Sequence, residues 1–258
     1  MTTPYIELKN VTKYYLTKDD AILALDDVNI EIEEGQFIGI VGPSGCGKTT
    51  ILKLIAGLIP YTAGEIRKGG ELVKEPQTDL GIIFQDSVLM DWRNVLDNVL
   101  AQIEIRGLRK GEYRQAAMDL LEAVGLDGFE DKMPYELSGG MRQRVSICRS
   151  LVHDPPLLLM DEPFGALDAL TREQISMDIQ HLWMEKQKTA VLITHSIPEA
   201  VLLSDLVIVM TPRPGKVADI IKIDMPRPRR WDRLSQDFNE YSGKIRRIFQ
   251  EAGVLSLE

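Results

Sequence analysis

The stretch that decides the fold is Gly42-Pro43-Ser44-Gly45-Cys46-Gly47-Lys48-Thr49. It follows the apolar run Phe37–Val41, typical of a buried strand, and precedes Thr50–Leu58, which is predicted to be a helix ended by Gly57 and Pro60. Glycines let the backbone amides of such a loop approach phosphate oxygens closely, and the helix N-terminus attracts anions. Lys48 supplies a positive charge and Thr49 a hydroxyl for Mg²⁺, so the stretch predicts a nucleotide-phosphate site. Cys46 occupies a variable position of this pattern and is interpreted as a small residue without a chemical role.

A second stretch supplies carboxylates. Asp161 and Glu162 directly follow the short apolar run Leu157–Met160, which predicts a buried strand. An acidic pair at the end of a strand is not rare, but downstream of a phosphate loop it indicates hydrolysis assisted by a metal ion. Asp161 is expected to hold Mg²⁺, directly or through water, and Glu162 to act as general base on the attacking water.

A third stretch, Leu137-Ser138-Gly139-Gly140-Met141-Arg142-Gln143, lies between the other two. Ser138 is expected to cap a helix, while Gly139 and Gly140 leave backbone amides accessible. This would make a second anion site of the same physical kind as the phosphate loop. The composition alone also permits an ordinary capped helix start.

Composition narrows the class of protein. The 258 residues are 44% hydrophobic, enough for a sizeable core, and 30 Lys and Arg against 39 Asp and Glu give a formal charge of -9. This balance argues against a nucleic-acid partner, because nucleic-acid binders are usually basic. The two cysteines, Cys46 and Cys148, suggest neither a disulfide framework nor a zinc site. Residues after Met1 show no signal-peptide pattern, and apolar runs such as Leu206–Met210 are too short for a bilayer, so any membrane role is expected to come through a partner.

Hydrophobic periodicity predicts both strands and helices. Alternation around Ile6–Leu8 and Val28–Ile32 predicts half-exposed antiparallel strands. Short apolar runs predict further buried strands at Leu80–Phe84, Leu157–Met160, Ala190–Thr194 and Leu206–Met210. Between Gln85 and Ser138 the period changes, since four residues share one helical face: Ala117, Leu120, Leu121 and Val124. A final helix is expected near Asp237–Ala252.

The phosphate loop, the stretch Leu137–Gln143 and the acidic strand, in this order, resemble the ATPase subunits of ATP-binding cassette (ABC) transporters across nearly the whole chain. The resemblance implies an α/β fold with a P-loop NTPase core, a mixed and mainly parallel sheet, an N-terminal antiparallel β subdomain and an inserted α-helical subdomain. It places the ABC ATPase domain at residues 1–225, with the helical subdomain at roughly 86–150, and a short basic and helical extension at 226–258.

The resemblance also implies roles for single residues. Gln85 resembles the family's glutamine that contacts Mg²⁺ and the water and senses the membrane subunit. His195 resembles the histidine that contacts the γ-phosphate, and Gly165-Ala166-Leu167-Asp168 resembles the loop that crosses the dimer interface. Tyr15 resembles the aromatic residue that stacks on adenine, with Tyr14 as the competing residue.

The implied site residues fall into three sets. The catalytic set is Lys48, Gln85, Glu162 and His195. The metal ligands are Thr49, Gln85 and Asp161. The nucleotide contacts come from Tyr15, the loop Gly42–Thr49, Thr50, Ser138, Gly139, Gly140 and Asp168.

In this family two ATP molecules lie between two subunits, so that the phosphate loop of one faces the Ser-Gly-Gly stretch of the other. The implied partners are a second copy of the chain or a homologous ATPase, integral membrane permease subunits and, indirectly, an extracytoplasmic substrate-binding protein. The implied cofactors are ATP and Mg²⁺. The implied location is peripheral, on the cytoplasmic face of a bacterial cell membrane.

Three further stretches resemble the nitrate, sulfonate and taurine importer ATPases: Trp92–Val99, Glu162–Arg172 and Thr211–Val217. The tail segment Met225–Arg229 adds to this likeness, and it implies uptake of a small solute of the sulfonate, nitrate or taurine kind. In this family the choice of solute belongs to the binding protein and permease. The basic residues of the tail are interpreted as a solvated face.

Two other classes of protein remain as alternatives. A soluble ABC ATPase acting on ribosomes or DNA usually carries two cassettes, or a long coiled coil for which the segment from Gln85 to Ser138 is too short. A non-hydrolysing interaction module would have lost catalytic residues, whereas Gln85, Glu162 and His195 are all present.

Overall fold

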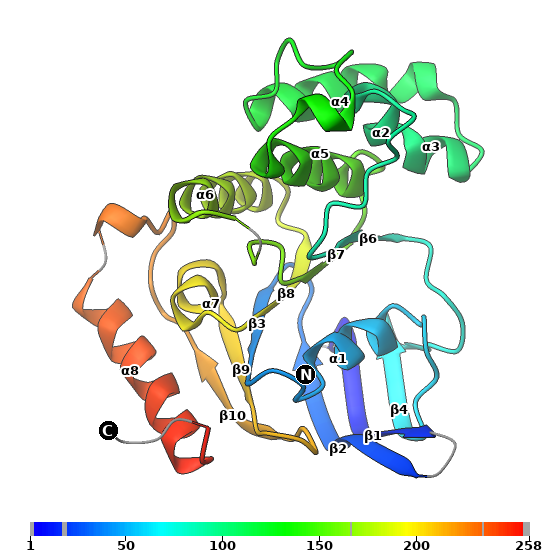
Figure 1. The fold of residues 1–258 in the computed structure, drawn as a ribbon. Coiled ribbons are helices and arrows are strands. Elements are labelled where there is room, and N and C mark those ends of the chain that lie inside the picture. Colours follow the sequence, from blue (N-terminus) through cyan, green and yellow to red (C-terminus); the bar gives the residue numbers. More distant parts are fainter. Residues whose placement is uncertain (1–2, 17–19, 166, 234, 255–258) are drawn as a thin grey trace. The chain divides into compact units, whose positions relative to one another are not determined.

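The computed structural model describes residues 3–16, 20–165, 167–233 and 235–254, which form two compact units (Figure 1). The first unit combines the residues up to Thr78 with those from Gln187 onward, and the second runs from Asp79 to Lys186. The chain therefore leaves the first unit once and returns to it once.

The first unit contains an antiparallel sheet with the strand order β2-β1-β4-β5. These strands are β1 (Ile6–Leu16), β2 (Ala21–Ile32), β4 (Ala63–Lys68) and β5 (Glu71–Leu72). Ile6 and Leu8 are buried while Lys9 is exposed, as expected from the alternation of their side chains along a strand. The two predicted antiparallel strands are confirmed, although both are longer than the apolar alternation indicated. β4 was not predicted, because Ile66 is its one buried residue.

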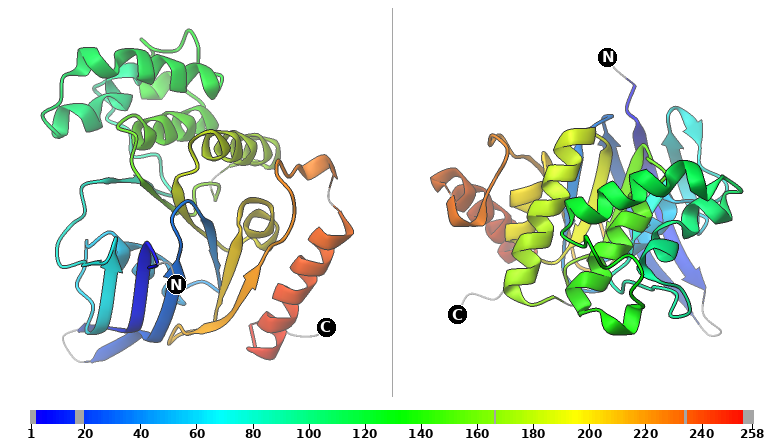
Figure 2. Two further views of the ribbon diagram at one scale, coloured as in Figure 1. Left: turned by 180° about the vertical axis from the view of Figure 1, so that it is seen from behind. Right: turned by 90° about the horizontal axis from the view of Figure 1, so that it is seen from above.

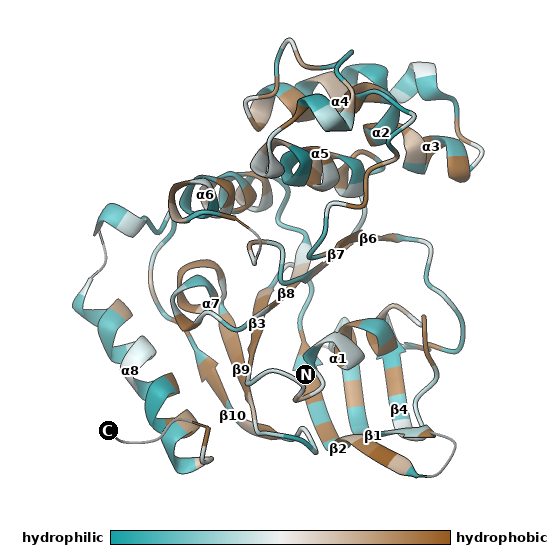
Figure 3. Cartoon of the chain, in the orientation of Figure 1, coloured by the Kyte–Doolittle hydropathy of each residue, from teal (hydrophilic) through white to brown (hydrophobic). Residues whose placement is uncertain are grey.

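The same unit contains strands of a mixed, mainly parallel sheet, in the order β10-β9-β3-β8. β3 (Phe37–Val41) pairs in parallel with both β8 (Thr189–Thr194) and β9 (Leu206–Met210), and β10 (Val217–Lys222) is antiparallel to β9. Every residue of β3 and β8 is buried, which explains why these strands are continuous apolar runs and appear brown in Figure 3. The three predicted buried strands of this unit are confirmed.

The first unit also contains helices, which in its described residues are α1 (Lys48–Ile55), α7 (Ile197–Leu203), the short 3-10 helix η2 (Trp231–Arg233) and α8 (Gln236–Glu251). α1 begins two residues earlier than predicted and is followed by Gly57 at φ 69°, where glycine ends the helix at no steric cost. The views in Figures 1 and 2 show α8 beside α7 and β10, and Lys244 of α8 lies 3.5 Å from Asp219 of β10.

The interpretation of the tail arginines as a solvated face is wrong for two of them. Arg229 is 7% exposed and its guanidinium donates to the carbonyls of Val201, Leu202, Ser204, Ile223 and Met225. Arg227 forms a 2.6 Å ion pair with Asp205. A guanidinium can be buried here because the carbonyls at the C-terminal end of α7 satisfy its donors. Burial nonetheless lowers the pKa of Arg229 to about 10.

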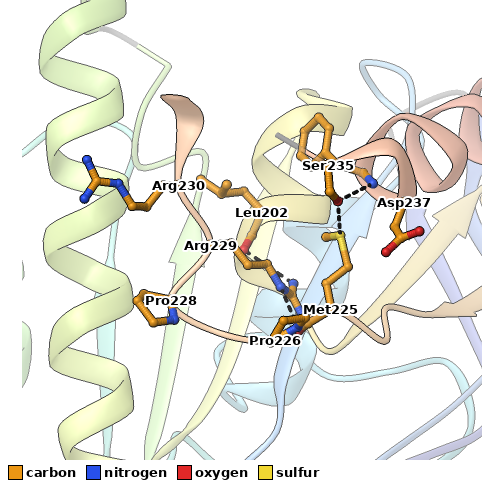
Figure 4. A pocket seen from close by; sticks show the side chains of 9 residues that line it. Leu202, Met225, Pro226, Pro228, Arg229, Arg230, Ser235 and Asp237 are labelled. Carbon is orange, nitrogen blue, oxygen red and sulfur yellow. Dashed lines mark hydrogen bonds between the residues drawn. The ribbon is translucent and has the colours of Figure 1, made fainter. Parts of the chain in front are cut away.

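Arg229 is one of the residues that line a pocket of about 570 Å³ (Figure 4). Leu202, Met225, Pro226, Pro228 and Phe238 supply most of its apolar lining. Arg230, also at this pocket, is exposed and pairs with Asp232 at 2.8 Å. The solvated interpretation therefore holds for Arg230 alone among these three arginines.

The second unit contains two parallel strands, β6 (Leu80–Ile83) and β7 (Leu157–Asp161), and its helices. The helices are α2 (Val95–Val99), α3 (Ala101–Ile105), α4 (Lys110–Ala123), η1 (Pro134–Glu136), α5 (Gly139–Leu151) and α6 (Ala169–Lys186). Residues of α2, α3, α4 and α5 share one core, to which the predicted helical face contributes Ala117, Leu121 and Val124. This confirms a mainly helical segment between the glutamine and the Ser-Gly-Gly stretch.

Candidate active site

The phosphate loop connects β3 to α1 inside the first unit. Lys48, 5% exposed, donates from Nζ to the carbonyls of Gly42 (2.8 Å) and Pro43 (3.1 Å). These two bonds occupy two of the three donors of the ammonium group and close the loop around it. The positive charge is therefore held within the loop rather than in solvent.

The loop has the conformation that an anion site needs. Gly47 has φ 102°, a torsion that side chains disfavour, and as the residue before α1 it offers no side chain to cap the helix. The amides of the first helical turn, which starts at Lys48, have no acceptor within the helix. Such free amides, together with the helix dipole, are the usual basis of anion binding at a helix N-terminus. A Cβ at Gly45 would have no neighbouring atom within 4 Å, so this part of the loop is open. These features fit a bound nucleotide phosphate.

Two threonines lie in the first turn of α1, and a tyrosine of β1 lies beside them. Thr49 is half-buried, whereas Thr50 is buried and its hydroxyl lies 3.3 Å from the Tyr15 hydroxyl. This contact places the half-exposed ring of Tyr15 at the phosphate-loop helix, and Lys13 Nζ lies 5.1 Å from its centroid. Tyr14 precedes Tyr15 on β1 and so points to the opposite side of the strand. The geometry favours Tyr15 over Tyr14 as the aromatic residue beside the loop.

His195 leaves the same edge of the sheet as the phosphate loop. Val41 pairs with Thr194 in parallel register, so the residues that follow, Gly42 and His195, emerge from neighbouring strands. His195 is exposed. The first unit thus brings together the loop, Tyr15 and His195.

A hydrogen-bond network fixes the backbone that follows His195. Ser196 caps α7 by accepting from the Glu199 amide, and its own amide donates to Thr194 Oγ1 (3.0 Å). The Thr194 hydroxyl in turn donates to the buried Glu199 carboxylate (2.5 Å). Glu199 was missed in the sequence, because a glutamate in the first turn of a helix is common and does not reveal a buried partner.

Gly215 is a second residue that sequence reasoning missed. A Cβ built on Gly215 would lie 1.9 Å from the carbonyl oxygen of Cys46, inside the phosphate loop. Its backbone also bonds β2, donating to Ala24 O (3.0 Å) and accepting from the Asp26 amide (3.1 Å). The position tolerates only glycine, because neither neighbouring backbone can retreat without moving the loop.

Replacing Gly215 by Ala is therefore expected to weaken ATP binding by at least about tenfold. The added methyl group would meet backbone atoms of the phosphate loop, so the loop itself would have to move, because no side chain can turn away to make room. Titration of the full chain with a fluorescent ATP analogue measures this. Gly243→Ala on α8 is the matched control, because a Cβ there meets no atom within 4 Å and alanine favours a helix. Equal affinities for the two variants would contradict the steric role of Gly215.

The second unit brings Gln85 and the acidic pair together. β6 and β7 are parallel, and Ile83 pairs with Met160, so Gln85 and Glu162 each lie two residues beyond a paired position. A Cβ on Gly165 would lie 3.3 Å from Gln85 Nε2 and 3.4 Å from the Glu162 carbonyl. Asp161 and Glu162 are half-buried, and Glu162 has φ 46°, a left-handed backbone that turns the chain sharply after β7.

Asp168 has a local structural role as well. Its carboxylate accepts from the Thr171 hydroxyl (2.6 Å) and the Thr171 amide (3.0 Å) at the start of α6, and these bonds lower its pKa. Of the predicted stretch Gly165–Asp168, Ala166 lies outside the described residues.

Ser138 caps α5 as expected, accepting from the Met141 amide at 3.3 Å. Gly139 is exposed, and a Cβ on Gly140 would lie 2.4 Å from Thr171 Cγ2 of α6. Gly140 therefore allows α5 and α6 to approach closely, a packing reason that the sequence did not reveal. The second unit thus carries Gln85, the acidic pair, Asp168 and the Ser-Gly-Gly stretch.

The ABC transporter family model matches residues 25–165 of this chain, which include the phosphate loop, the Ser-Gly-Gly stretch and the acidic pair. The chain belongs to the ABC transporter ATPase family. It is 46% identical to the uncharacterized ABC transporter ATP-binding protein MJ0412 of Methanocaldococcus jannaschii, over 98% of this chain and 94% of that protein. It is 39% identical to the aliphatic sulfonates import ATP-binding protein SsuB of Bacillus cereus, covering 97% and 98% of the two chains. It is 44% identical to the taurine import ATP-binding protein TauB of Ruegeria pomeroyi, covering 82% and 80%.

Solved ABC cassettes share the fold. The dimeric structure of MJ0796, a bacterial ABC transporter cassette, has a TM-score of 0.75 and 35% identity, covering 86% of this chain and all of that chain. A post-hydrolysis dimer of the same cassette, bound to ADP and Pi, gives 0.74 and 34%. As an ABC transporter ATPase, the chain is an ATP-binding subunit that hydrolyses ATP with Mg²⁺. Among the described residues, no helix is long and apolar enough to cross a bilayer.

Proposed function

We propose that this ABC ATPase energises the uptake of a small sulfonate-like solute, such as taurine or an alkanesulfonate, with nitrate as the related alternative. The relatives SsuB and TauB, named for import of these solutes, support the proposal over most of the chain. The observation that carries the coupling to ATP is the placement of three proposed hydrolytic groups: Lys48 lies within its loop, and Gln85 lies in register with Glu162.

The first unit is proposed to bind ATP. The loop Gly42–Thr49 and Thr50 hold the phosphates, with Lys48 as the positive charge for the β- and γ-phosphates. Tyr15 stacks on adenine, and His195 contacts the γ-phosphate. The sheet edge that the loop shares with His195, and the contact of the Tyr15 hydroxyl with Thr50, support this assignment.

The second unit is proposed to supply the hydrolytic and closing groups. Glu162 removes a proton from the attacking water, and Gln85 orients that water. Thr49, Gln85 and Asp161 are the proposed ligands of Mg²⁺, which when bound would neutralise charge on the phosphate oxygens. Ser138, Gly139, Gly140 and Asp168 would contact the nucleotide held by the second copy.

Two copies are proposed to close around two ATP molecules. Hydrolysis at both composite sites would then allow the two copies to separate. The complex would include an extracytoplasmic substrate-binding protein and lie on the cytoplasmic face of a bacterial membrane. Residues 1–225 would form the ATPase domain, with the helical subdomain near 86–150, and residues 226–258 a C-terminal extension.

Pull-down from detergent-solubilised membranes tests the proposal. We expect the Glu162→Gln variant, incubated with ATP, to retain an integral membrane permease, because slowed hydrolysis keeps the pair closed. Lys48→Met under the same conditions is the matched control, expected to capture less permease in the closed state. Recovery of ribosomes or nucleic acid in place of a permease would overturn the transporter assignment.

The solute class needs a separate measurement. The purified complex, reconstituted with its binding protein, is expected to hydrolyse ATP faster when taurine or an alkanesulfonate is added. Nitrate and a neutral sugar serve as the alternative and the negative control. Stimulation by the sugar alone would contradict the proposed solute class while leaving the ATPase assignment intact.

A further inference from the structure

The backbone on both sides of Gln85 is held by side chains of one helix. Gln143 of α5 donates from Nε2 to the Phe84 carbonyl, directly before Gln85, at 3.2 Å. Arg149 of the same helix donates from Nη2 to the Ser87 carbonyl (2.7 Å) and from Nη1 to the Val88 carbonyl (2.8 Å). All these residues belong to the second unit.

The contact of Arg149 is specific to a guanidinium. Its two terminal nitrogens bind two successive carbonyls, which requires the flat fork of arginine. Among the described residues, Arg149 forms no ion pair with a carboxylate, so its charge is directed at backbone oxygens. Burial lowers the pKa of Arg149, a sign that this guanidinium gives up water for those two carbonyls.

The segment held by Arg149 has a conformation that it would not adopt by itself. Val88 has φ 43°, in the left-handed region that a β-branched residue disfavours. Its side chain is 64% exposed, so apolar burial does little to compensate for the backbone strain. The hydrogen bond from Arg149 to the Val88 carbonyl stabilises this turn directly.

α5 starts at the Ser-Gly-Gly stretch, because Ser138 is its cap. The same helix therefore carries a proposed nucleotide contact at one end and holds the Gln85 segment through Gln143 and Arg149. We propose that Arg149 is a positioning residue for ATP hydrolysis: it fixes the Gln85 segment to α5, so that Gln85 and the Ser-Gly-Gly stretch move as one body. This rests on the proposed role of Gln85.

The test is a double-mutant cycle in the full chain, with Arg149→Met, Gln85→Ala and the combined variant. Arg149→Met is expected to lower kcat for ATP by about 10- to 100-fold, the usual cost of misplacing a reacting group by about 1 Å, with KM for ATP changed less than threefold. In the Gln85→Ala background the same substitution is expected to change kcat less than about twofold, because the residue that Arg149 positions is already absent.

Arg149→Lys keeps the charge and the helix but cannot bind both carbonyls, and it serves if Arg149→Met does not fold. It is expected to show the same dependence on Gln85 with a smaller loss, and faster hydrogen exchange in a peptide covering residues 84–90. Arg114→Met, at an exposed position of α4, is the matched control and is expected to leave kcat unchanged.

An equal loss of kcat in the wild-type and Gln85→Ala backgrounds would overturn the inference, since Arg149 would then act through stability or another group. A failure of the proposed function looks different: Gln85→Ala alone would keep the wild-type kcat. The kcat of the Gln85→Ala single variant, read beside that of the double variant, therefore separates the two failures.

Discussion

Glu162→Gln is expected to lower the ATP turnover of this ABC ATPase by about 10²–10⁴-fold, the usual contribution of a general base, while ATP still binds. Glu162 lies directly after β7 at φ 46°, two residues past the Met160–Ile83 pair, and this register brings Gln85 to the same edge. Glutamine has the same shape and tolerates the same turn. The substitution therefore removes the ability to accept a proton and leaves the backbone as it is.

Two measurements are needed for this prediction. Phosphate release from the full chain gives kcat, and equilibrium titration with ATP gives affinity. Glu173→Gln is the matched control, because Glu173 is an exposed glutamate on α6 of the same unit. Turnover within a factor of two of the wild type would remove Glu162 from the role of general base. A parallel loss of ATP affinity would indicate structural damage instead.

Lys48→Met is expected to lower both ATP affinity and turnover, by about 10²–10³-fold in kcat, the usual cost of removing one charged donor from a developing anion. Lys48 is 5% exposed and its ammonium is held by the carbonyls of Gly42 and Pro43, so the charge is directed into the loop without reorganisation. Methionine keeps most of the length of the side chain and loses its charge and donors. The effect should therefore appear in binding, unlike that of Glu162→Gln.

Isothermal titration with ATP, together with phosphate release, checks this prediction. Lys53→Met is the control, because Lys53 lies on the same helix and is exposed. The loss of two loop hydrogen bonds also predicts a small decrease in melting temperature without ATP. Unchanged affinity for Lys48→Met would show that the loop amides alone bind the phosphates.

Much of the site could be predicted because its chemistry lies in contiguous motifs. A glycine loop between an apolar strand and a helix, or a carboxylate pair at a strand end, puts its functional groups together by local geometry alone. Ser138 is the cap of α5 for the same reason, since an N-cap bond spans three residues. β4 was missed because one buried residue, Ile66, gives no periodic signal.

The sequence by itself determined the family, the buried parallel strands and the candidate groups for phosphate, metal and water, because each is encoded by neighbouring residues. Only the tertiary structure decided why Gly215 must lack a side chain and why Glu199 is buried beside Thr194. It also decided that Arg229 is buried and that Arg227 pairs with Asp205, although both belong to a basic tail segment. It also decided that Arg149 holds Val88, 61 positions away along the chain. These contacts join residues far apart in sequence, and no local pattern records them, because burial and hydrogen-bond partners are set by how the elements pack.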